Sequence, residues 1–316
     1  MQRIRPDIPT LLRKRYRLPV IGEWLSRRRI LRRYKRAFGE YPQLDPPRTF
    51  NERITHRLLY DRDPRLQIIS DKIEVKAFLA QRVPHENIVP LLGQWSDARD
   101  IDFEILPDAF VLKPSFACGR TLLVPDKRRL DTALAVRTAN NWLKRNYYDW
   151  SSEWGYRDLP HRLMAEPFMM NAQGGPAQEI SVHIVRGRPG HMFGYLEPRG
   201  TPDRKYIALT ATGKPLDAFA DPNHAQIHRG HARQIEEIRH WREDVVSLAL
   251  MAAKDFDYMR VDFYLTPEAP RIGELTPYTS AGRENNITRE IDLLLGRCWE
   301  DGFDLDAHQA ERKSAN

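Results

Sequence analysis

The clearest alternation of hydrophobic and polar residues along the chain runs from Tyr258 to Leu265. Every second residue is apolar there, which predicts a strand with one buried and one exposed face. Pro267 and Pro270 bracket a short turn, so a second strand is expected to start near Arg271. The pattern therefore predicts a β-hairpin, around which we organise the rest of the chain.

Two carboxylates oppose each other in this hairpin if Leu265 pairs with Arg271, because Asp262 then lies opposite Glu274. Like charges directly opposed on one sheet face repel each other, so replacing either carboxylate should not destabilise the fold. A divalent cation between them would favour the pair. Mg²⁺ suits this position, because it takes one or two protein carboxylates and completes its shell with water and phosphate oxygens. Arg260, on the same face, would then contact a phosphate. The alternative is a surface hairpin with scattered charges.

A second strong pattern predicts a helix from Glu23 to Tyr41, with apolar residues at three- and four-residue steps. These residues are Trp24, Leu31, Tyr34 and Phe38. Residues 1–36 contain thirteen Lys and Arg but only two acidic residues. A basic amphipathic helix is typical of membrane-surface binding. In the alternative, the apolar stripe packs on its own domain and the arginines are solvated. Nucleic-acid binding is a third reading, but no aromatic-plus-basic motif accompanies the helix.

Two further helices are expected after a proline-rich linker. Thr49 and Glu52 form a capping box for the first. The second is expected over residues 71–82, where Lys72 and Lys76 lie four residues apart on one face. The pattern alone favours two solvated lysines.

A hairpin with a tip of small residues is expected at residues 110–124. The loop 115–120 could fold over a polyphosphate and donate backbone N–H groups, while Lys113 supplies positive charge. Gly119 is the one glycine in the loop. Cys118 has no nearby His and Asp arrangement that would activate it, so a buried thiol is predicted there.

The rest of the chain alternates between strand and helix patterns. Strands are expected at 88–92, 162–168, 179–185 and 188–196, and helices at 131–146 and 235–256. His224, His228 and His231 have helix-like spacing, but histidines in a polar segment more often face solvent than bind zinc.

The composition is that of a globular protein, with 41% hydrophobic and 29% charged residues among 316. No apolar run approaches the ~20 residues of a membrane span, and the N-terminus lacks a signal-peptide core. Two cysteines form no disulfide framework or metal-ligand spacing, so we expect a cytoplasmic protein. The net charge of +7 favours an anionic partner: a nucleotide, an acidic glycan, a membrane surface or nucleic acid.

Taken together, these segments resemble the ATP-grasp superfamily, and within it the TupA-like group found with bacterial polysaccharide genes. The matching segments lie at 50–52, 59–64, 70–72, 89–93, 106–108, 110–113, 141–148, 165–166, 260–262 and 273–276. Their order and spacing together carry the resemblance.

The resemblance implies an α+β protein with the ATP-grasp fold, in which two α+β subdomains enclose ATP. The division that follows is a basic amphipathic helical extension at 1–45, an N-terminal helical segment at 46–86, a lid subdomain at 87–167, and a C-terminal subdomain with the Mg²⁺ site at 168–316.

The resemblance also implies roles for residues of the site. Lys72 and Lys113 would hold the phosphates of ATP, and the flap 115–120, with Ser115 and Gly119, would cover them. Residues Glu166, Pro167, Phe168 and Met169 would form the hinge against adenine. Asp262 and Glu274 would bind Mg²⁺, while Arg260 would contact the transferred phosphoryl group. Arg283 would clamp a substrate carboxylate; Arg289 and Arg204 are further candidates.

Three positions depart from the pattern of relatives. The flap is not rich in glycine. The acidic residue expected after the hinge, for the ribose hydroxyls, falls at Met170 or Asn171. The third metal-site position, usually Asn in the superfamily, is Thr276, as it is in the TupA-like group.

The implied activity is that of an ATP-dependent carboxylate–amine ligase with an acyl-phosphate intermediate. Its substrates would be a uronic-acid polysaccharide or its precursor and an amino acid or amine, and the enzyme could lie peripherally on the inner face of the membrane. Two alternatives stay open: a phosphotransferase acting on a sugar hydroxyl, and a non-catalytic protein that binds glycan or nucleic acid.

Overall fold

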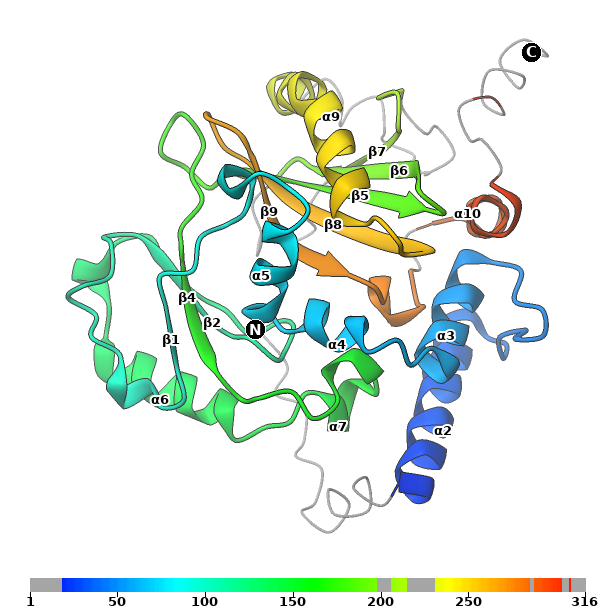
Figure 1. The fold of residues 1–316 in the computed structure, drawn as a ribbon, viewed down its shortest axis with the longest axis horizontal. Helices are drawn as coiled ribbons and strands as arrows, with labels where there is room; N and C mark the ends of the chain where they lie inside the picture. Colours follow the sequence, from blue (N-terminus) through cyan, green and yellow to red (C-terminus); the bar gives the residue numbers. More distant parts are fainter. Residues whose placement is uncertain (1–18, 198–205, 215–230, 285–286, 303–306, 308–316) are drawn as a thin grey trace.

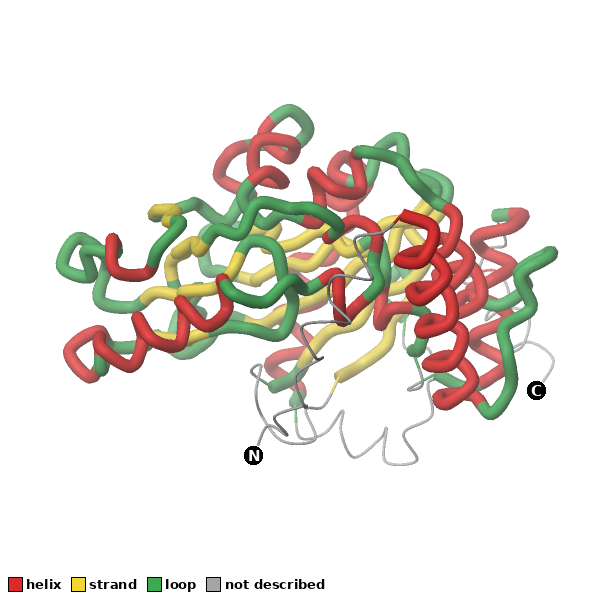
Figure 2. The backbone as a smooth tube through the Cα atoms, turned by 90° about the horizontal axis from the view of Figure 1, so that it is seen from below, coloured by secondary structure: helices red, strands yellow, loops and turns green. Residues whose placement is uncertain are grey.

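The structure is a computed structural model that describes residues 19–197, 206–214, 231–284, 287–302 and 307. Two antiparallel sheets form its centre, with helices packed on their outer faces (Figures 1 and 2). The α+β class predicted from the sequence is confirmed. None of the helices within the described ranges is long and apolar enough to cross a membrane.

The larger sheet has five strands in the order β7-β6-β5-β8-β9. Its strands are β5 (Gln178–Val185), β6 (Arg188–Tyr195), β7 (Tyr206–Thr210), β8 (Tyr258–Leu265) and β9 (Pro270–Thr276). Helix α9 (Ala232–Ala252) covers one face and buries Ile238 against Gly194 of β6, where a Cβ would lie 2.2 Å from the Ile238 side chain. A bare backbone at residue 194 therefore lets this helix approach the sheet closely.

The smaller sheet has four strands in the order β1-β4-β2-β3. Its strands are β1 (Gly93–Trp95), β2 (Phe110–Pro114), β3 (Leu122–Val124) and β4 (Leu163–Pro167). Asp131 caps helix α6 (Thr132–Leu143), since its side chain accepts a hydrogen bond from the Leu134 N–H. The helix packs Ala139 against the sheet. The predicted strand at 88–92 is wrong in extent. Within it, Ile88 forms an isolated β-bridge with Ile272, and strand β1 begins only at Gly93.

Helices surround the two sheets. They are α3 (Phe50–Tyr60), α4 (Arg65–Ser70), α5 (Glu74–Ala80), α7 (Tyr148–Ser151) and α10 (Arg289–Asp301), with 3₁₀ turns η1 (His85–Asn87), η2 (Ala98–Asp100), η3 (Lys127–Arg129), η4 (Trp154–Tyr156) and η5 (Thr279–Ala281). The capping box of Thr49 and Glu52 is confirmed at the start of α3. The two sheets fall within residues 87–167 and 168–316, but the division into domains itself stays a prediction.

The predicted helix over residues 71–82 is wrong at its start. The Asp71 carboxylate accepts a hydrogen bond from the Ile73 N–H at 2.9 Å, and the Lys72 N–H donates to the Ser115 carbonyl at 3.0 Å. Lys72 therefore lies in a turn before α5, because a side-chain to backbone bond replaces the first helical turn. Lys72 and Lys76 do not share a helix face.

The central hairpin has the predicted carboxylate pair but not the predicted turn. Leu265 pairs with Pro270 instead of Arg271, which alone would shift the register by one residue. A β-bulge between Asp262 and Phe263 compensates, so that Asp262 does lie opposite Glu274. The extra residue of the bulge is Gly273, where a Cβ would lie 2.6 Å from the Tyr264 ring.

The N-terminal helix α2 (Pro19–Phe38) packs on its own domain along part of the predicted stripe. Ile30 and Tyr34 are buried, with 4% and 1% of their surfaces exposed, and Ile30 joins the main hydrophobic core. Trp24, expected in the same stripe, is 55% exposed. The helix runs beside α3 and α7 (Figure 1).

Two buried histidines stack within the larger sheet. His183 and His191 each have 1% of their surface exposed, and their ring centroids lie 3.8 Å apart. The Tyr258 hydroxyl lies 3.0 Å from Nδ1 of His183. Burial lowers the pKa of His191 to about 3; burial, with the neighbouring ring and Arg260 adding to it, lowers the pKa of His183 well below 6.5. Of the three histidines considered for zinc, His224 and His228 lie outside the described residues.

We predict that this pair makes the protein sensitive to acid. Both pKa values are lower in the folded than in the unfolded chain, so the stability they contribute is present above pH ~6.5 and is lost as pH falls below it. Each histidine should change the free energy of unfolding by up to about 1.4 kcal/mol per pH unit. Urea unfolding at pH 7, 6 and 5 should show this slope, and His191→Phe should reduce it. An unchanged slope in His191→Phe would contradict the assignment.

Candidate functional site

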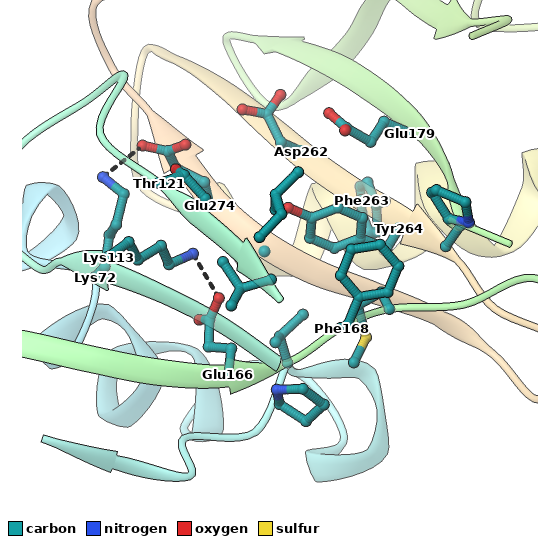
Figure 3. Close-up of a pocket in the computed structure, with 18 of the residues that line it drawn as sticks. Lys72, Lys113, Thr121, Glu166, Phe168, Glu179, Asp262, Phe263, Tyr264 and Glu274 are labelled. Carbon is teal, nitrogen blue, oxygen red and sulfur yellow. Dashed lines mark ion pairs between the residues drawn. The ribbon is translucent and has the colours of Figure 1, made fainter. Parts of the chain in front are cut away.

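A cavity lies between the two sheets, at the edge where β2 and β4 face β8 and β9 (Figure 3). Charged side chains gather at one end, and the apolar side chains of Val89, Val111, Leu123, Phe168 and Met169 line the remainder. Of the residues predicted for the site, Lys72, Lys113, Gly119, Glu166, Pro167, Phe168, Met169, Asp262 and Glu274 line this cavity.

An ion pair joins the turn before α5 to strand β9. The Lys72 ammonium lies 3.1 Å from the Glu274 carboxylate and also donates to the Ala117 carbonyl at 3.1 Å. Burial opposes the charge of Lys72, which is 8% exposed, but Cys118, which is ionised at the high pH where Lys72 would lose its proton, and the carboxylates of Glu274 and Glu166 outweigh burial and raise the pKa of Lys72. Lys72 is therefore a fixed cation at the charged end of the cavity.

A second buried cluster places two lysines on one carboxylate. Glu166 of β4 lies 2.5 Å from Lys113 of β2 and 2.7 Å from Lys76 of α5. Burial alone would raise the pKa of Glu166, but the two ammonium groups lower it. The reading of Lys76 as solvated is wrong, since its side chain is 13% exposed. Lys76 was missed because its role depends on β4, which is distant in sequence.

Asp262 is held by three neighbouring side chains. Arg260 donates to both of its oxygens, at 2.8 and 2.7 Å, Ser181 donates at 2.6 Å and Thr276 at 3.1 Å. Each oxygen thus accepts two hydrogen bonds. Arg260 faces Asp262 and is not among the lining residues, and Thr276, the predicted third metal-site position, donates to the Asp262 carboxylate.

The hinge after β4 contributes side chains and backbone to the opposite end. The Phe168 N–H donates to the Ala109 carbonyl at 3.3 Å, and the Met169 carbonyl accepts from the Ala177 N–H at 2.9 Å. Met170 pairs with Pro176, and Asn171 accepts from the Gly175 N–H in the turn between them. Neither residue lines the cavity, so the acid expected there for the ribose hydroxyls is absent from both positions.

Glu179 supplies a carboxylate that sequence analysis missed. It lies on β5 and lines the cavity beside Asp262 (Figure 3). Strand β5 pairs with β8 so that Ser181 lies opposite Asp262, and Glu179 is two residues from Ser181 on the same face. The period-two pattern of β5 was available in the sequence, but the pairing of β5 with β8 was not.

Two other predicted residues lie away from the lining. Ser115 is fully buried behind the wall, where its carbonyl accepts from Lys72 and its N–H donates to the Arg162 carbonyl. Arg283 lies in the turn after η5 and donates to the Ala281 carbonyl at 3.1 Å. Of the further candidates, Arg289 lies 3.7 Å from Glu40, and Arg204 is outside the described residues.

Cys118 lines the cavity and is half-buried. Its Sγ lies 2.8 Å from the Tyr156 hydroxyl, 3.8 Å from Glu274 and 4.0 Å from the Lys72 ammonium. Burial raises the pKa of the thiol to about 11, so the thiol stays protonated at neutral pH. This supports the reading of Cys118 as a non-nucleophilic residue.

The residues present fit a magnesium–nucleotide complex. The opposed carboxylates of Asp262 and Glu274 supply oxygen ligands of the kind that Mg²⁺ prefers, and the hydroxyls of Ser181 and Thr276 hold the Asp262 carboxylate in place by hydrogen bonds. Lysines at the charged end suit phosphates, and the apolar remainder suits a base.

Comparison with known proteins gives one family match. A model of the TupA-like ATP-grasp family matches residues 52–299. No curated protein matches the chain significantly.

Similar solved structures include two ligases and a synthetase. The ATP-grasp ligase PsnB, complexed with a phosphomimetic variant of its minimal precursor, Mg and ADP, is 12% identical with a TM-score of 0.45, over 78% of this chain and 65% of PsnB. D-alanine–D-alanine ligase from Bacillus anthracis complexed with ATP is 15% identical with a TM-score of 0.40, over 75% and 69%. N5-carboxyaminoimidazole ribonucleotide synthetase from Thermus thermophilus is 16% identical with a TM-score of 0.40, over 69% and 48%. This chain thus spans about half to two thirds of the length of these proteins.

The Lys72–Glu274 ion pair changes the expectation for carboxylate variants. Glu274→Gln should destabilise the ligand-free protein, because it leaves the buried ammonium of Lys72 without its anionic partner; we expect a loss of about 1–3 kcal/mol. The double variant Lys72→Met/Glu274→Gln should recover most of this loss. Denaturant unfolding of the two single variants and the double variant measures the coupling. Additive losses would show that the pair contributes nothing.

Proposed function

Because the chain belongs to the TupA-like ATP-grasp family, whose model spans residues 52–299, we propose that it is an ATP-dependent carboxylate–amine ligase. The observation that carries this proposal is the charged end of the cavity, where Lys72 meets Glu274 directly opposite Asp262. Cations that could bind phosphates lie there beside carboxylates that could bind a metal. Phosphoryl transfer requires both kinds of group close together.

The proposed reaction has two steps. A substrate carboxylate oxygen attacks the γ-phosphorus of ATP, the bond to the bridging oxygen breaks, and ADP leaves with the electron pair. The nitrogen of an amine then attacks the acyl carbon, inorganic phosphate leaves, the nitrogen loses a proton, and an amide remains. Both steps develop negative charge on phosphoryl oxygens, so fixed cations accelerate them.

We assign most roles in this mechanism to residues that line the cavity. Lys72 and Lys113 would hold the phosphates, and closure of the loop around Gly119 would exclude water from the acyl phosphate. Asp262 and Glu274 would hold Mg²⁺, which when bound neutralises charge on the phosphoryl oxygens.

Further residues would bind the reacting groups at one end of the site and the nucleoside of ATP at the other. Arg260 would contact the transferred group, and Arg283 is proposed to clamp the substrate carboxylate. At the other end, the hinge would face adenine; it consists of Glu166, Pro167, Phe168 and Met169. The Glu166 side chain pairs with Lys113 and Lys76, so it would not contact the base. Glu179 would accept hydrogen bonds from the ribose hydroxyls.

The substrate class that we propose is a uronic-acid polysaccharide or its precursor, joined to an amino acid or another amine. An acidic glycan suits a chain with a net charge of +7. If the glycan is carried on a lipid, the enzyme would work at the inner face of the membrane.

We predict that Mg·ATP stabilises the folded protein. A ligand that binds only the native state raises stability by RT ln(1 + [L]/Kd), or about 2.7 kcal/mol at a hundredfold excess over Kd. A thermal-shift assay should show a rise in Tm with Mg·ATP that is smaller with ATP and EDTA. An equal shift without Mg²⁺, or none at all, would contradict the proposed site.

The reaction itself is tested by a screen of uronic acids against amino acids, read by phosphate release and product mass. We expect phosphate release to require both an acid and an amine, with an amide as product. Asp262→Asn should reduce turnover at least about 100-fold. A stable phosphorylated sugar formed without an amine would establish the phosphotransferase instead, and the absence of any turnover in a protein that binds no Mg·ATP would favour a binding protein.

A further inference from the structure

Helix α2 has two faces of different character. The outer face, defined as Trp24, Arg28, Arg32, Lys35 and Arg36, is exposed. The inner face, defined as Ser26, Arg29, Ile30, Arg33 and Tyr34, lies against the rest of the protein. Glu23 is the one acidic residue of the helix. The family match begins at residue 52, so nothing in it accounts for either face.

The outer face suits a flat anionic surface. Arg28, Arg32 and Arg36 follow each other at four-residue steps, which places them in a row along the helix. Trp24, 55% exposed, lies at the start of the row with the Arg28 guanidinium 5.1 Å from its ring centroid. Cations with an exposed tryptophan fit the headgroup region of a bilayer, where charge and an amphipathic ring are both favourable.

The inner face fixes the segment 148–157, which includes α7 and η4. Arg29 donates to the carbonyls of Asp149 and Trp150, the second at 3.2 Å, and Arg33 donates to the Ser151 carbonyl at 3.1 Å. These bonds satisfy carbonyls of a very short helix that has few internal partners.

The same segment reaches the nucleotide cavity at its other end. The Tyr156 hydroxyl lies 2.8 Å from Cys118, and the Lys72 ammonium lies 5.9 Å from the Tyr156 ring centroid. Gly155 is packed closely, since a Cβ there would lie 2.3 Å from the Ser70 hydroxyl. A shift of the segment would therefore be passed to Lys72 and to the flap residue Cys118, because tightly packed groups cannot absorb it.

We propose that α2 docks the protein on a bilayer containing anionic lipid through its outer face, and that its inner face couples this docking to the nucleotide cavity through residues 148–157. Docking is independent of the cavity, whereas the coupling rests on the proposed binding of Mg·ATP there but not on which reaction follows. It accounts for arginines on both faces of one helix, one pair fixed by carbonyls and the other exposed.

Two matched double variants, one residue apart along the helix, separate the faces. Arg28→Gln/Arg32→Gln removes two exposed charges, and Arg29→Gln/Arg33→Gln removes two charges from the inner face. Co-sedimentation with phosphatidylcholine vesicles, with and without phosphatidylglycerol, measures docking at low and high salt. Titration with Mg·ATP measures the nucleotide Kd.

The outer pair should lower affinity for the anionic vesicles by roughly 25-fold, at about fivefold for each cation, and leave the nucleotide Kd unchanged. The inner pair should leave vesicle binding nearly unchanged and weaken Mg·ATP by about 2- to 30-fold. Trp24 should preserve some binding at high salt. If the inner pair fails to fold, Arg29→Lys/Arg33→Lys, with hydrogen exchange over 148–157, takes its place and should show faster exchange there.

Three results would overturn the proposal. Equal loss of vesicle binding in both pairs would show an effect of total charge rather than of a face. Tighter binding to DNA or to a soluble acidic polysaccharide, with vesicles displaced, would assign the outer face to that partner. An unchanged nucleotide Kd and unchanged exchange in the inner-face variants would remove the coupling.

Discussion

The cavity depends on pairing buried charges, above all on the Lys72–Glu274 ion pair. A buried ionised group costs several kcal/mol unless an opposite charge and hydrogen bonds compensate it. Of the carboxylates that line this cavity, Glu274 pairs with Lys72, Glu166 pairs with two lysines and Asp262 pairs with Arg260. The pairs also join elements distant in sequence. Lys72 precedes α5 whereas Glu274 lies on β9, so the pair connects the helical segment to the larger sheet.

These ion pairs affect how the cavity could bind a ligand that carries both positive and negative charge. A magnesium–nucleotide complex brings a cation for carboxylates and anions for lysines. When it enters, the buried groups can exchange one partner for another without any of them being left unpaired, so the desolvation that is usually costly has already occurred in the folded protein. The cost of burying these paired charges is then a cost of folding, and binding benefits from a site whose donors are already oriented.

The sequence was sufficient for the parts of this site that follow from local pattern. The alternation in β8 and β9 predicted the opposed carboxylates. The pairing at the turn was predicted wrongly, but the bulge at Gly273 adds one residue to β9, so that Asp262 still lies opposite Glu274. The sequence was insufficient where the position of a residue depends on contacts that the local pattern does not reveal. Lys72 was placed on a helix because helical spacing cannot reveal that the Asp71 side chain bonds the backbone first. Glu179 was missed because its place in the cavity depends on which strand β5 pairs with.

The amphipathic pattern of the N-terminal helix supported two interpretations, membrane-surface binding and packing on the protein. A single face of the helix cannot do both. Residues four apart lie on one side of a helix, whereas residues one apart differ by about 100°. Arg29 and Arg33 therefore face the protein together with Ile30 and Tyr34, while Arg28 and Arg32 point away from it. An apolar stripe narrower than half the helix leaves room for both a packed and a solvated set of arginines. Burial of the stripe is therefore compatible with a ligand on the opposite side of the helix.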